Sequence, residues 1–270
     1  MVTKSIQAVC SEVLDCGYSI IEDFLDKKTI DQSQKALRWL NLGPRERIAN
    51  IKDDLFYNIS YSDYILEVAK LFFDEEAKPI QSLLFKYPTQ QLIHQDTVHF
   101  STYPNDMMLA CWIALEDVCL ENGTLEYIPY SHLLPTFSKY DFPTEHRDRG
   151  LKSKDLIKAA YCKYENNLQR TIKSLNLRPK YLSCKAGTAF IWHPRLWHGG
   201  SKPRNETLTR YSYVTHYEAA ETPIYLKHFN GLPLLPRLEN PKDLKSQKQL
   251  YRYGIFSFAN RLAKILTLHI

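Results

Sequence analysis

Two residues in the first half of the chain, His94 and Asp96, have the types and the spacing to hold a metal ion. They follow an apolar run over residues 82–87 that is typical of a β-strand, with a short turn between. Because residues two apart in an extended segment point to the same side, the imidazole and the carboxylate can face one point in space. One further histidine would complete the 2-His-1-carboxylate set that holds non-haem Fe(II) in proteins. We predict His198, in an aromatic-rich run far downstream, as this third ligand.

An H-x-D triplet is by itself a weak signal, because the same pair also occurs as polar residues on a solvated strand. Two other histidines lie near the predicted ligands in sequence, His99 after the first pair and His193 before His198. Either has the chemistry of a ligand, but we expect both near the mouth of the pocket or in ordinary hydrogen bonds. The assignment therefore depends on the elements that surround these residues.

The composition predicts a globular chain with a sizeable core. Of its 270 residues 44% are apolar and 13% aromatic, and the 18 Tyr and 12 Phe suit a pleated, half-buried sheet. The net charge is +5, and the Lys and Arg residues are scattered along the chain. Nucleic-acid binding requires a stripe of positive charge, so we expect a small-molecule substrate and no nucleic acid.

Cysteine usage and the N-terminus bear on the compartment. Six cysteines are spread over the chain, and none forms a C-x-x-C pair, which excludes a zinc ribbon and a thioredoxin-type motif. The N-terminus lacks a basic-then-apolar signal pattern, and no apolar run has the length of a membrane span. We therefore expect reduced thiols and a cytoplasmic protein.

The sequence pattern changes near residue 80, from helical spacing of apolar residues to short strand-like runs. Residues 1–80 are predicted to be mostly helical, with a strand over 17–25 and helices that begin after Asp26 and at Asp63. Residues 81–220 consist of short apolar runs separated by turn residues, which predicts a jelly-roll core. The runs that we assign to this core cover residues 107–116, 123–132, 187–192 and 209–217. In the last run Arg210, Ser212, Val214 and His216 fall on one side and the tyrosines on the other.

Two segments are additions to this core. An insert at 137–180 is charged and then helical from Ser153 to Ser174, and long insertions are often lids or binding loops. The C-terminal extension, 221–270, is proline-rich over 223–241 and ends in an apolar helix from Tyr251 to Leu268. We expect this helix to dock on the fold or on a second subunit, which leaves a homodimer open, rather than on a membrane surface. Substrate specificity is expected to reside in the insert and in the proline-rich segment.

Five ordered blocks of the chain resemble the phytanoyl-CoA dioxygenase family of Fe(II)/2-oxoglutarate-dependent oxygenases. The blocks are His94-Gln95-Asp96, Cys111-Trp112-Ile113-Ala114-Leu115-Glu116, Asn122-Gly123-Thr124-Leu125 with Pro129-Tyr130-Ser131-His132, Gly187-Thr188, and His198-Gly199-Gly200-Ser201. They span about half of the chain. The resemblance implies a single domain over 1–270 that is mainly β with flanking α: a double-stranded β-helix (jelly roll, cupin-like) core between N-terminal and C-terminal helices.

The resemblance also implies a cofactor set and a co-substrate site. His94, Asp96 and His198 would hold Fe(II) and leave positions for 2-oxoglutarate and O2. In the family an arginine about a dozen residues after the second histidine binds the co-substrate, and Arg210 fits that position. Arg204 ranks second because it falls in a turn. Trp112 matches a position that lines the co-substrate pocket, although an ordinary core aromatic explains it equally well.

The function implied is hydroxylation of an unactivated C–H bond in a small metabolite or carrier-linked intermediate, with succinate and CO2 as co-products. The related halogenases lack the carboxylate ligand, so the presence of Asp96 favours hydroxylation. Two alternatives stay open: a non-catalytic member that binds a metabolite or partner, and a zinc-dependent hydrolase, which would leave Arg210 and Trp112 without a role. The sequence does not identify the prime substrate, since the fold does not determine it, and it does not separate hydroxylation from desaturation or cyclisation. Glu126 is expected to face solvent and His132 to be structural.

Overall fold

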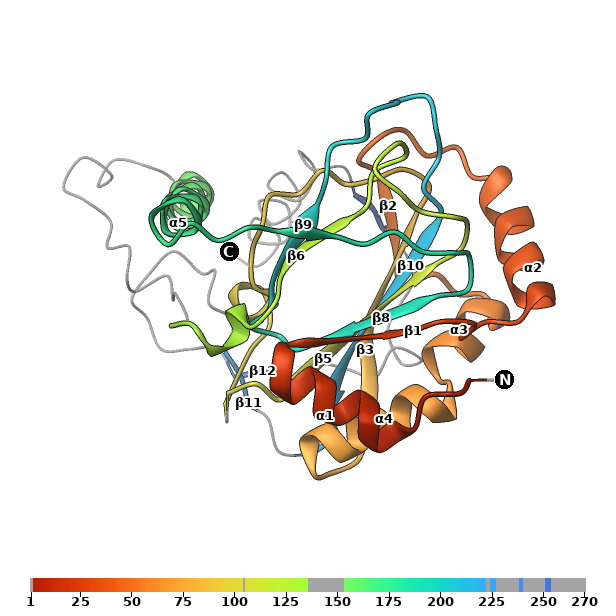
Figure 1. Cartoon of the computed structure of the whole chain (residues 1–270), viewed down its shortest axis with the longest axis horizontal. Coiled ribbons are helices and arrows are strands. Elements are labelled where there is room, and N and C mark those ends of the chain that lie inside the picture. The colour runs from red at the N-terminus through yellow and green to blue at the C-terminus, as the bar shows by residue number, and fades with distance from the viewer. Residues whose placement is uncertain are drawn as a thin grey trace.

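Two antiparallel sheets face each other and form the core of the protein (Figure 1). The computed structural model describes residues 2–103, 105–135, 153–221, 224–226, 238–239 and 251–253. The larger sheet has seven strands in the order β1-β8-β5-β10-β3-β2-β13, and the smaller has the order β7-β6-β9. This arrangement of two facing sheets is that of a jelly roll, and it confirms the predicted fold class.

Most strands of the core coincide with the short apolar runs of the sequence. The larger sheet consists of β1 (Tyr18–Ile21), β8 (Ala189–Trp192), β5 (Met108–Ala114), β10 (Ser212–Ala219), β3 (Ala77–Phe85), β2 (Arg47–Ala49) and β13 (Tyr251–Tyr253). The smaller sheet consists of β7 (Lys180–Tyr181), β6 (Leu125–Ile128) and β9 (Trp197–Gly200). A third sheet pairs β4 (Ser101–Tyr103), β11 (Ile224–Leu226) and β12 (Leu238–Glu239). Two single-turn helices, η1 (Asp96–Val98) and η2 (Ser131–Leu133), lie between strands.

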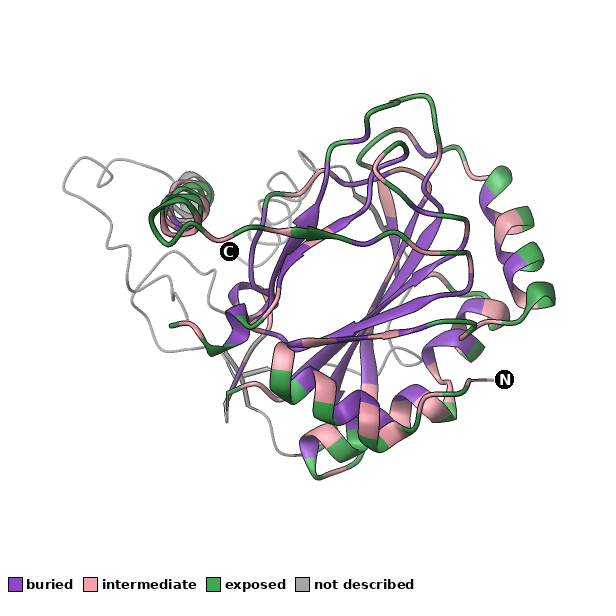
Figure 2. Cartoon of the chain, viewed as in Figure 1, coloured by how far each residue is buried: buried purple, intermediate pink, exposed green. Residues whose placement is uncertain are grey.

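Helices cover the outer side of the larger sheet, with their inward faces buried and their outward faces exposed (Figure 2). These helices are α1 (Ile6–Cys16), α2 (Lys27–Arg38), α3 (Asp54–Ser60) and α4 (Asp63–Phe73). Side chains cap the first two, since Ser5 Oγ accepts from Ala8 N–H and Asp26 Oδ1 accepts from Thr29 N–H. The helices after Asp26 and from Asp63 were predicted from sequence, whereas α3 and β2 were not.

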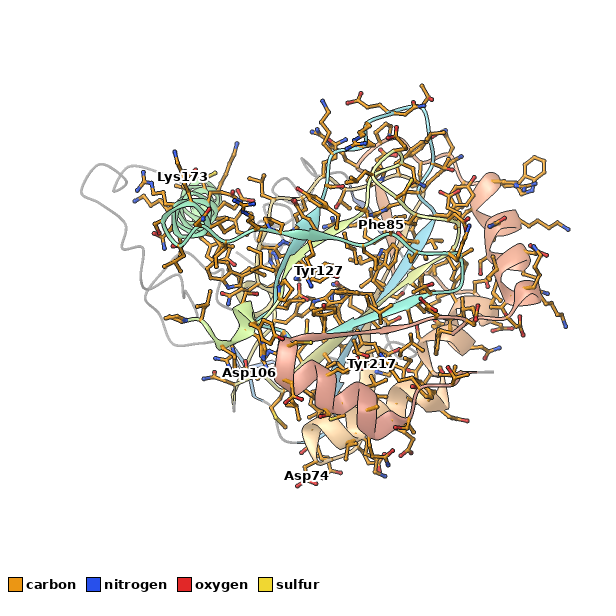
Figure 3. All side chains as sticks on the ribbon, viewed as in Figure 1. Asp74, Phe85, Asp106, Tyr127, Lys173 and Tyr217 are labelled. Atoms are coloured by element: carbon orange, nitrogen blue, oxygen red, sulfur yellow. The ribbon has the colours of Figure 1, made fainter. Side chains whose placement is uncertain are left out.

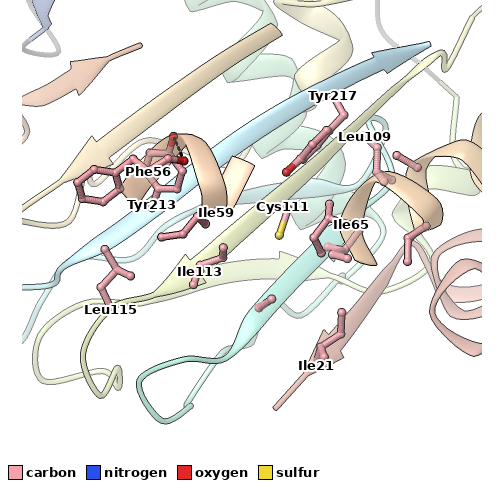
Figure 4. Packing of buried hydrophobic residues seen from close by; sticks show 14 of the residues in the cluster. Ile21, Phe56, Ile59, Ile65, Leu109, Cys111, Ile113, Leu115, Tyr213 and Tyr217 are labelled. Carbon is pink, nitrogen blue, oxygen red and sulfur yellow. Dashed lines mark hydrogen bonds between the residues drawn. The ribbon is translucent and has the colours of Figure 1, made fainter. Parts of the chain in front are cut away.

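A two-residue period in β10 divides the interior into two clusters. Tyr213 and Tyr217 point outward and pack with Phe56 and Ile65 under the helices (Figure 4). Val214 points between the two sheets and joins Trp112 in a second cluster. Tyr127 of β6 also lies in this inner space (Figure 3). The predicted alternation along 209–217 is therefore confirmed.

The insert contributes one long helix, and its predicted bounds are confirmed. Helix α5 (Ser153–Ser174) lies beside the smaller sheet, on the side away from the larger one (Figure 1). Its side chains Tyr164 and Leu168 pack on Ile128 and Trp197. The charged part of the insert before Ser153 lies outside the described residues. No helix of the described residues is long and apolar enough to cross a membrane.

The prediction for the C-terminal extension is wrong at its start. Residues Tyr251–Tyr253 form strand β13, which pairs with β2, rather than the first turn of a helix. The apolar period that suggested the helix takes no account of the free edge that β2 offers to a partner strand. The rest of that helix, 254–268, and most of the proline-rich segment lie outside the described residues.

Glycines in β9 allow the segment 89–94 to cross directly over that strand. A Cβ added at Gly199 would stand 2.7 Å from the carbonyl oxygen of Gln91 and 3.0 Å from the amide nitrogen of Ile93. A Cβ at Gly200 would stand 2.9 Å from Thr89 Oγ1. At Gly199 the contacts are with backbone atoms, so a residue other than glycine requires a backbone shift, whereas at Gly200 the Thr89 side chain can move.

We expect Gly199→Ala to lower the free energy of unfolding by about 2 kcal/mol, because the new methyl group meets backbone atoms that cannot rotate away. Urea denaturation followed by circular dichroism measures the change. Gly43→Ala is the matched control, since its Cβ would meet no atom closer than 3.6 Å. An equal loss in both variants would show that the close approach at Gly199 has no energetic consequence.

Candidate metal centre

His94 and His198 are brought together by direct backbone pairing. The amide of His94 donates to the carbonyl of His198 at 2.8 Å, and the amide of His198 donates to the carbonyl of His94 at 3.0 Å. The two residues thus form an isolated antiparallel bridge. Directly opposite residues in such a pair point to the same face, and the two imidazole centroids lie 4.6 Å apart.

Asp96 completes a buried three-residue cluster. Its Oδ1 lies 3.7 Å from Nε2 of His94 and 3.6 Å from Nε2 of His198. One candidate ligand atom from each residue lies within 4.8 Å of the others, and all three residues are buried. The structure therefore brings the three predicted ligands together, with one candidate ligand atom of each directed at a shared point.

Both imidazoles are held in the tautomer that a metal requires. Nδ1 of His94 donates to the carbonyl of Leu92 at 2.9 Å, and Nδ1 of His198 donates to the carbonyl of Leu196 at 2.9 Å. Each Nε2 therefore has no proton, and its lone pair faces the cluster. Burial lowers the pKa of each histidine to about 4, and for His94 the neighbouring His198 lowers it further. Both rings are accordingly neutral at pH 7, the form that binds metal.

The two carboxylate oxygens of Asp96 have different surroundings. Trp192 of β8 donates its indole N–H to Oδ2 at 2.8 Å, inside the barrel. The amide of Asp96 donates to the carbonyl of Pro194 at 2.9 Å, which holds the backbone of this residue. Oδ1 is the oxygen that faces the two histidines. A carboxylate oriented in this way presents one oxygen to a metal and rests the other on the protein.

Helix α5 supports the cluster from outside. The hydroxyl of Tyr164 accepts a hydrogen bond from the amide of Gln95 at 2.8 Å, between the two ligands of the H-x-D triplet. Tyr164 and Leu168 pack on Ile93 and Trp197, which are the immediate neighbours of His94 and His198. The insert is thus attached to the backbone that carries the candidate ligands.

The side chain of Gln91 touches the candidate site directly. Its amide nitrogen lies 3.3 Å from Nε2 of His94 and 3.5 Å from the hydroxyl of Tyr161 on α5. Because Nδ1 of His94 carries the ring proton, Nε2 is the acceptor in this contact. A metal at Nε2 would replace the hydrogen bond from Gln91.

Arg210 is a buried cation with unused hydrogen-bonding capacity. It is 2% exposed, and neither Nε nor Nη1 has a hydrogen-bond partner. Its guanidinium carbon lies 5.7 Å from the centre of the Trp112 ring. Burial lowers the pKa of Arg210 to about 10, against the attraction of Glu116. A buried guanidinium with free N–H groups is a ready partner for a carboxylate.

Arg210 lies two residues before β10, and not on the strand as predicted. Its amide donates to the carbonyl of Lys86 at 2.9 Å, which continues the line of the strand. Arg204, the second-ranked alternative, is exposed and pairs with Glu121 at 3.2 Å on the surface. The structure therefore does not bring Arg204 to the cluster.

Several further polar atoms inside the barrel have no partner. We call Arg210, Ser212, Val214, His216 and Glu218 the inner row, because they share the inward side of β10 and the residues that lead into it. Ser212 Oγ and His216 Nδ1 belong to this row, and neither has a hydrogen-bond partner. The indole nitrogen of Trp112, which lies opposite Val214, is likewise without one. Such unpaired buried groups are costly in an isolated fold and are typical of a binding site.

The remaining histidines lie at the edge of the site or away from it. The ring of His99 lies 5.7 Å from that of His94, edge to face, so it borders the cluster without joining it. Nδ1 of His193 accepts from the amide of Arg195 at 3.1 Å, and Nε2 of His132 hydrogen-bonds the carbonyl of Leu14 at 3.0 Å. Both have the structural roles expected of them.

Sequence reasoning missed the contacts of Trp192, Gln91 and Tyr164. Trp192 and Asp96 are 96 residues apart, and Tyr164 and Gln95 are 69 apart, so no local pattern marks them. Glu126 was expected to face solvent. It lies on β6 next to the inward-pointing Tyr127 and is half-buried, which raises its pKa.

The fold and the cluster define the class of protein: a jelly roll with a buried His-Asp-His set between its two sheets. A family model, described as phytanoyl-CoA dioxygenase (PhyH), matches residues 46–210. The chain belongs to this family.

Curated relatives match the chain over part of their length. Phytanoyl-CoA dioxygenase domain-containing protein 1 of Bos taurus is 36% identical over 84 residues, which are 30% of this chain and 29% of that protein. Its homolog in Caenorhabditis briggsae is 28% identical over 105 residues, 37% of this chain and 36% of the relative. The peroxisomal phytanoyl-CoA dioxygenase of Homo sapiens is 22% identical over 81% of this chain and 60% of its own. The chain thus matches about a third of the first two relatives.

Solved structures share the fold. The epimerase SnoN from nogalamycin biosynthesis, described as non-heme and alpha ketoglutarate dependent, has a TM-score of 0.61 at 19% identity over 88% of this chain and 94% of its own. EctD from S. alaskensis, solved with 2-oxoglutarate and 5-hydroxyectoine, has a TM-score of 0.57 at 16% identity over 91% of this chain and 81% of its own.

We expect Trp192→Phe to weaken metal binding by about 10- to 100-fold, because Asp96 loses the hydrogen bond that orients its carboxylate. Anaerobic titration with Fe(II), or with Co(II) as a spectroscopic probe, measures the dissociation constant. Trp39→Phe is the control, since Trp39 is 84% exposed. Unchanged affinity in the Trp192 variant would rule out the orienting role.

We expect Tyr164→Phe to weaken metal binding as well, and to destabilise the metal-free protein by about 1–3 kcal/mol, because the amide of Gln95 is left buried without a partner. Urea denaturation of the metal-free protein and the same titration measure the two effects. Tyr181→Phe, at a half-exposed tyrosine on β7, is the control. A loss of stability without a loss of affinity would show that α5 supports the fold but not the cluster.

Proposed function

We propose that this chain is an Fe(II)- and 2-oxoglutarate-dependent oxygenase, with the metal held by His94, Asp96 and His198. The observation that carries the proposal is a buried cluster of two neutral histidines and Asp96, in the same barrel as a buried arginine whose Nε and Nη1 have no hydrogen-bond partner. Family membership supports it, as do the related structures of SnoN with Fe3+ and alpha ketoglutarate and of EctD with 2-oxoglutarate.

The charges of the site fit this pair of ligands. Fe(II) with the Asp96 carboxylate has a charge of +1, and the 2-oxoglutarate dianion brings the sum to −1. Arg210 supplies a positive charge that compensates the dianion in this buried site. In this proposal the Arg210 guanidinium binds the distal carboxylate of the co-substrate, the Ser212 hydroxyl donates to the same group, and the Trp112 ring borders it.

The buried side chains between the two sheets form an inner cluster, which would keep water from the site. Trp112, Phe190 and Val214 are buried side chains of three neighbouring strands, and they pack between the sheets. Leu125 and Tyr127 close the space from the smaller sheet. A dry, shaped cavity strengthens each charged contact within it.

When bound, Fe(II) with 2-oxoglutarate and O2 would supply the oxidant for a C–H bond of the substrate, and the 2-oxoglutarate would leave as succinate and CO2. Nε2 of both histidines and Oδ1 of Asp96 would hold the metal, and the indole N–H of Trp192 orients the Asp96 carboxylate. We propose hydroxylation of a small molecule as the outcome, because all three ligand positions are filled. Related structures include an epimerase and a carbocyclase, so the outcome depends on how the substrate is held.

Anaerobic titration of the purified chain with Fe(II) and then 2-oxoglutarate tests the proposal. We expect a visible charge-transfer band in the wild-type protein and its loss in His198→Ala. Arg210→Gln is expected to bind Fe(II) normally but to weaken 2-oxoglutarate binding by about 100-fold, as the loss of one member of a buried charge pair does.

Arg204→Gln is the matched control, since Arg204 is a surface residue in the same segment. A folded wild-type protein that binds Zn(II) and gives no band with Fe(II) and 2-oxoglutarate would contradict the proposal and favour the hydrolase.

A further inference from the structure

Glu218 ends the inner row with a carboxyl group to which none of the described residues donates a hydrogen bond. Its side chain is 0% exposed, and neither Oε1 nor Oε2 has a hydrogen-bond partner. An acidic side chain is almost never fully buried unless it is paired. The mechanism proposed above gives Glu218 no role.

The register of β10 places Glu218 inside the barrel. Glu218 lies opposite Met108 of β5, which belongs to the inner cluster with Trp112. Its neighbours Tyr217 and Ala219 belong to the outer cluster under the helices. Because successive residues of a strand face opposite sides, the Glu218 carboxyl points to the same side as His216.

The inner row runs past the candidate metal site. His216 interacts electrostatically with Asp96, and its ring packs on Phe100 at 4.7 Å. Arg210 lies six residues before His216, and Glu218 lies two residues after it. At about 3.3 Å per residue, Arg210 and Glu218 are separated by roughly 26 Å along the wall. If Arg210 holds the co-substrate, Glu218 lies at the other end of the inner row, beyond His216, where a second ligand would not overlap the co-substrate.

The charges around Glu218 leave it in need of a cation. Lys78 of β3 lies directly opposite, but its Nζ donates to the carbonyl of Ala220 at 3.1 Å. Burial raises the pKa of Glu218 to about 8, an effect that Lys78 partly opposes and the nearby Glu75 reinforces. The carboxyl group is therefore largely protonated at pH 7, and a cation bound beside it would favour its ionised form. An ammonium group offers three N–H donors and a positive charge, which together satisfy both carboxylate oxygens.

We propose that Glu218 binds a protonated amine of the prime substrate and so fixes which C–H bond faces the metal. The inference rests on the proposed function and narrows its substrate class to small molecules that carry an amine. A structural role is the alternative, in which the carboxyl group serves only to stabilise the barrel wall.

The test uses the full chain loaded anaerobically with Fe(II) and 2-oxoglutarate. The probes are n-alkylammonium ions from ethyl to hexyl, with the n-alcohols of equal length as uncharged counterparts. Binding is read from the shift of the charge-transfer band and from the rise in Tm. We expect the ammonium ions to bind at least about 10-fold more tightly than the alcohols, and Glu218→Gln to abolish this preference.

Glu126→Gln is the matched control, because Glu126 is a half-buried glutamate on β6 of the smaller sheet, outside the inner row, and it should leave the preference unchanged. The Tm of each variant without probe shows whether it folds, and we expect Glu218→Gln to be as stable as the wild type. A strongly lowered Tm in Glu218→Gln, equal affinities for ammonium ions and alcohols, or no ammonium binding at all would overturn the proposal.

The two proposals fail separately. Absence of the charge-transfer band in wild-type protein refutes the iron and 2-oxoglutarate function. The Tm shift of the metal-free protein with ammonium ions still tests Glu218 in that case. If the band forms normally in the wild type and in Glu218→Gln, and both bind ammonium ions with equal affinity, the role of Glu218 is refuted while the iron and 2-oxoglutarate function stands.

Discussion

Two reciprocal backbone hydrogen bonds between His94 and His198 hold the candidate site together. They join the loop that follows β3 to the start of β9, and thereby join the larger sheet to the smaller one. The pairing depends on Gly199, where any side chain would strike the crossing segment. Because the imidazoles leave a paired backbone on the same side, their approach is set by the fold before any metal binds. Asp96, Trp192 and Arg210 then need only be placed relative to this fixed pair.

The cost of the site is visible in its unpaired groups. Arg210, Ser212, His216 and Glu218 form a line of buried polar side chains whose atoms the protein itself leaves largely unsatisfied. A fold optimised for stability alone would fill this line with apolar residues. This line is the wall of the barrel at which the proposed function places its ligands. The helices packed on the outer side of the same strands supply stabilisation that offsets the unpaired groups.

Local sequence patterns predicted those parts of the molecule that depend on local geometry. The H-x-D spacing placed His94 and Asp96 together, and the period of two along 209–217 placed Arg210 and His216 on the inward side. The bounds of α5 also followed from its composition. His198 was assigned by its neighbourhood and by family resemblance, since no spacing rule links it to His94. The structure brings the three side chains together, and their role as ligands remains the proposal that the titrations test.

Other features had no local signal. Trp192 and Tyr164 reach their partners across long stretches of chain, and β2 is too short to show a period. The short strand β13 was mistaken for a helix because a free sheet edge is not a property of its own sequence. Long-range contacts of this kind follow from the packing of the whole barrel, and no local sequence pattern indicates them.

The Nδ1 hydrogen bonds of the two histidines have a consequence for how the site tolerates change. Each proton is directed by a main-chain carbonyl two residues earlier, at Leu92 and Leu196, rather than by a side chain. Substitution at Leu92, which is half exposed, alters the side chain but keeps the carbonyl. The tautomer of both histidines is thus set by the main chain, so a point mutation at Leu92 or Leu196 leaves the hydrogen-bond acceptor in place.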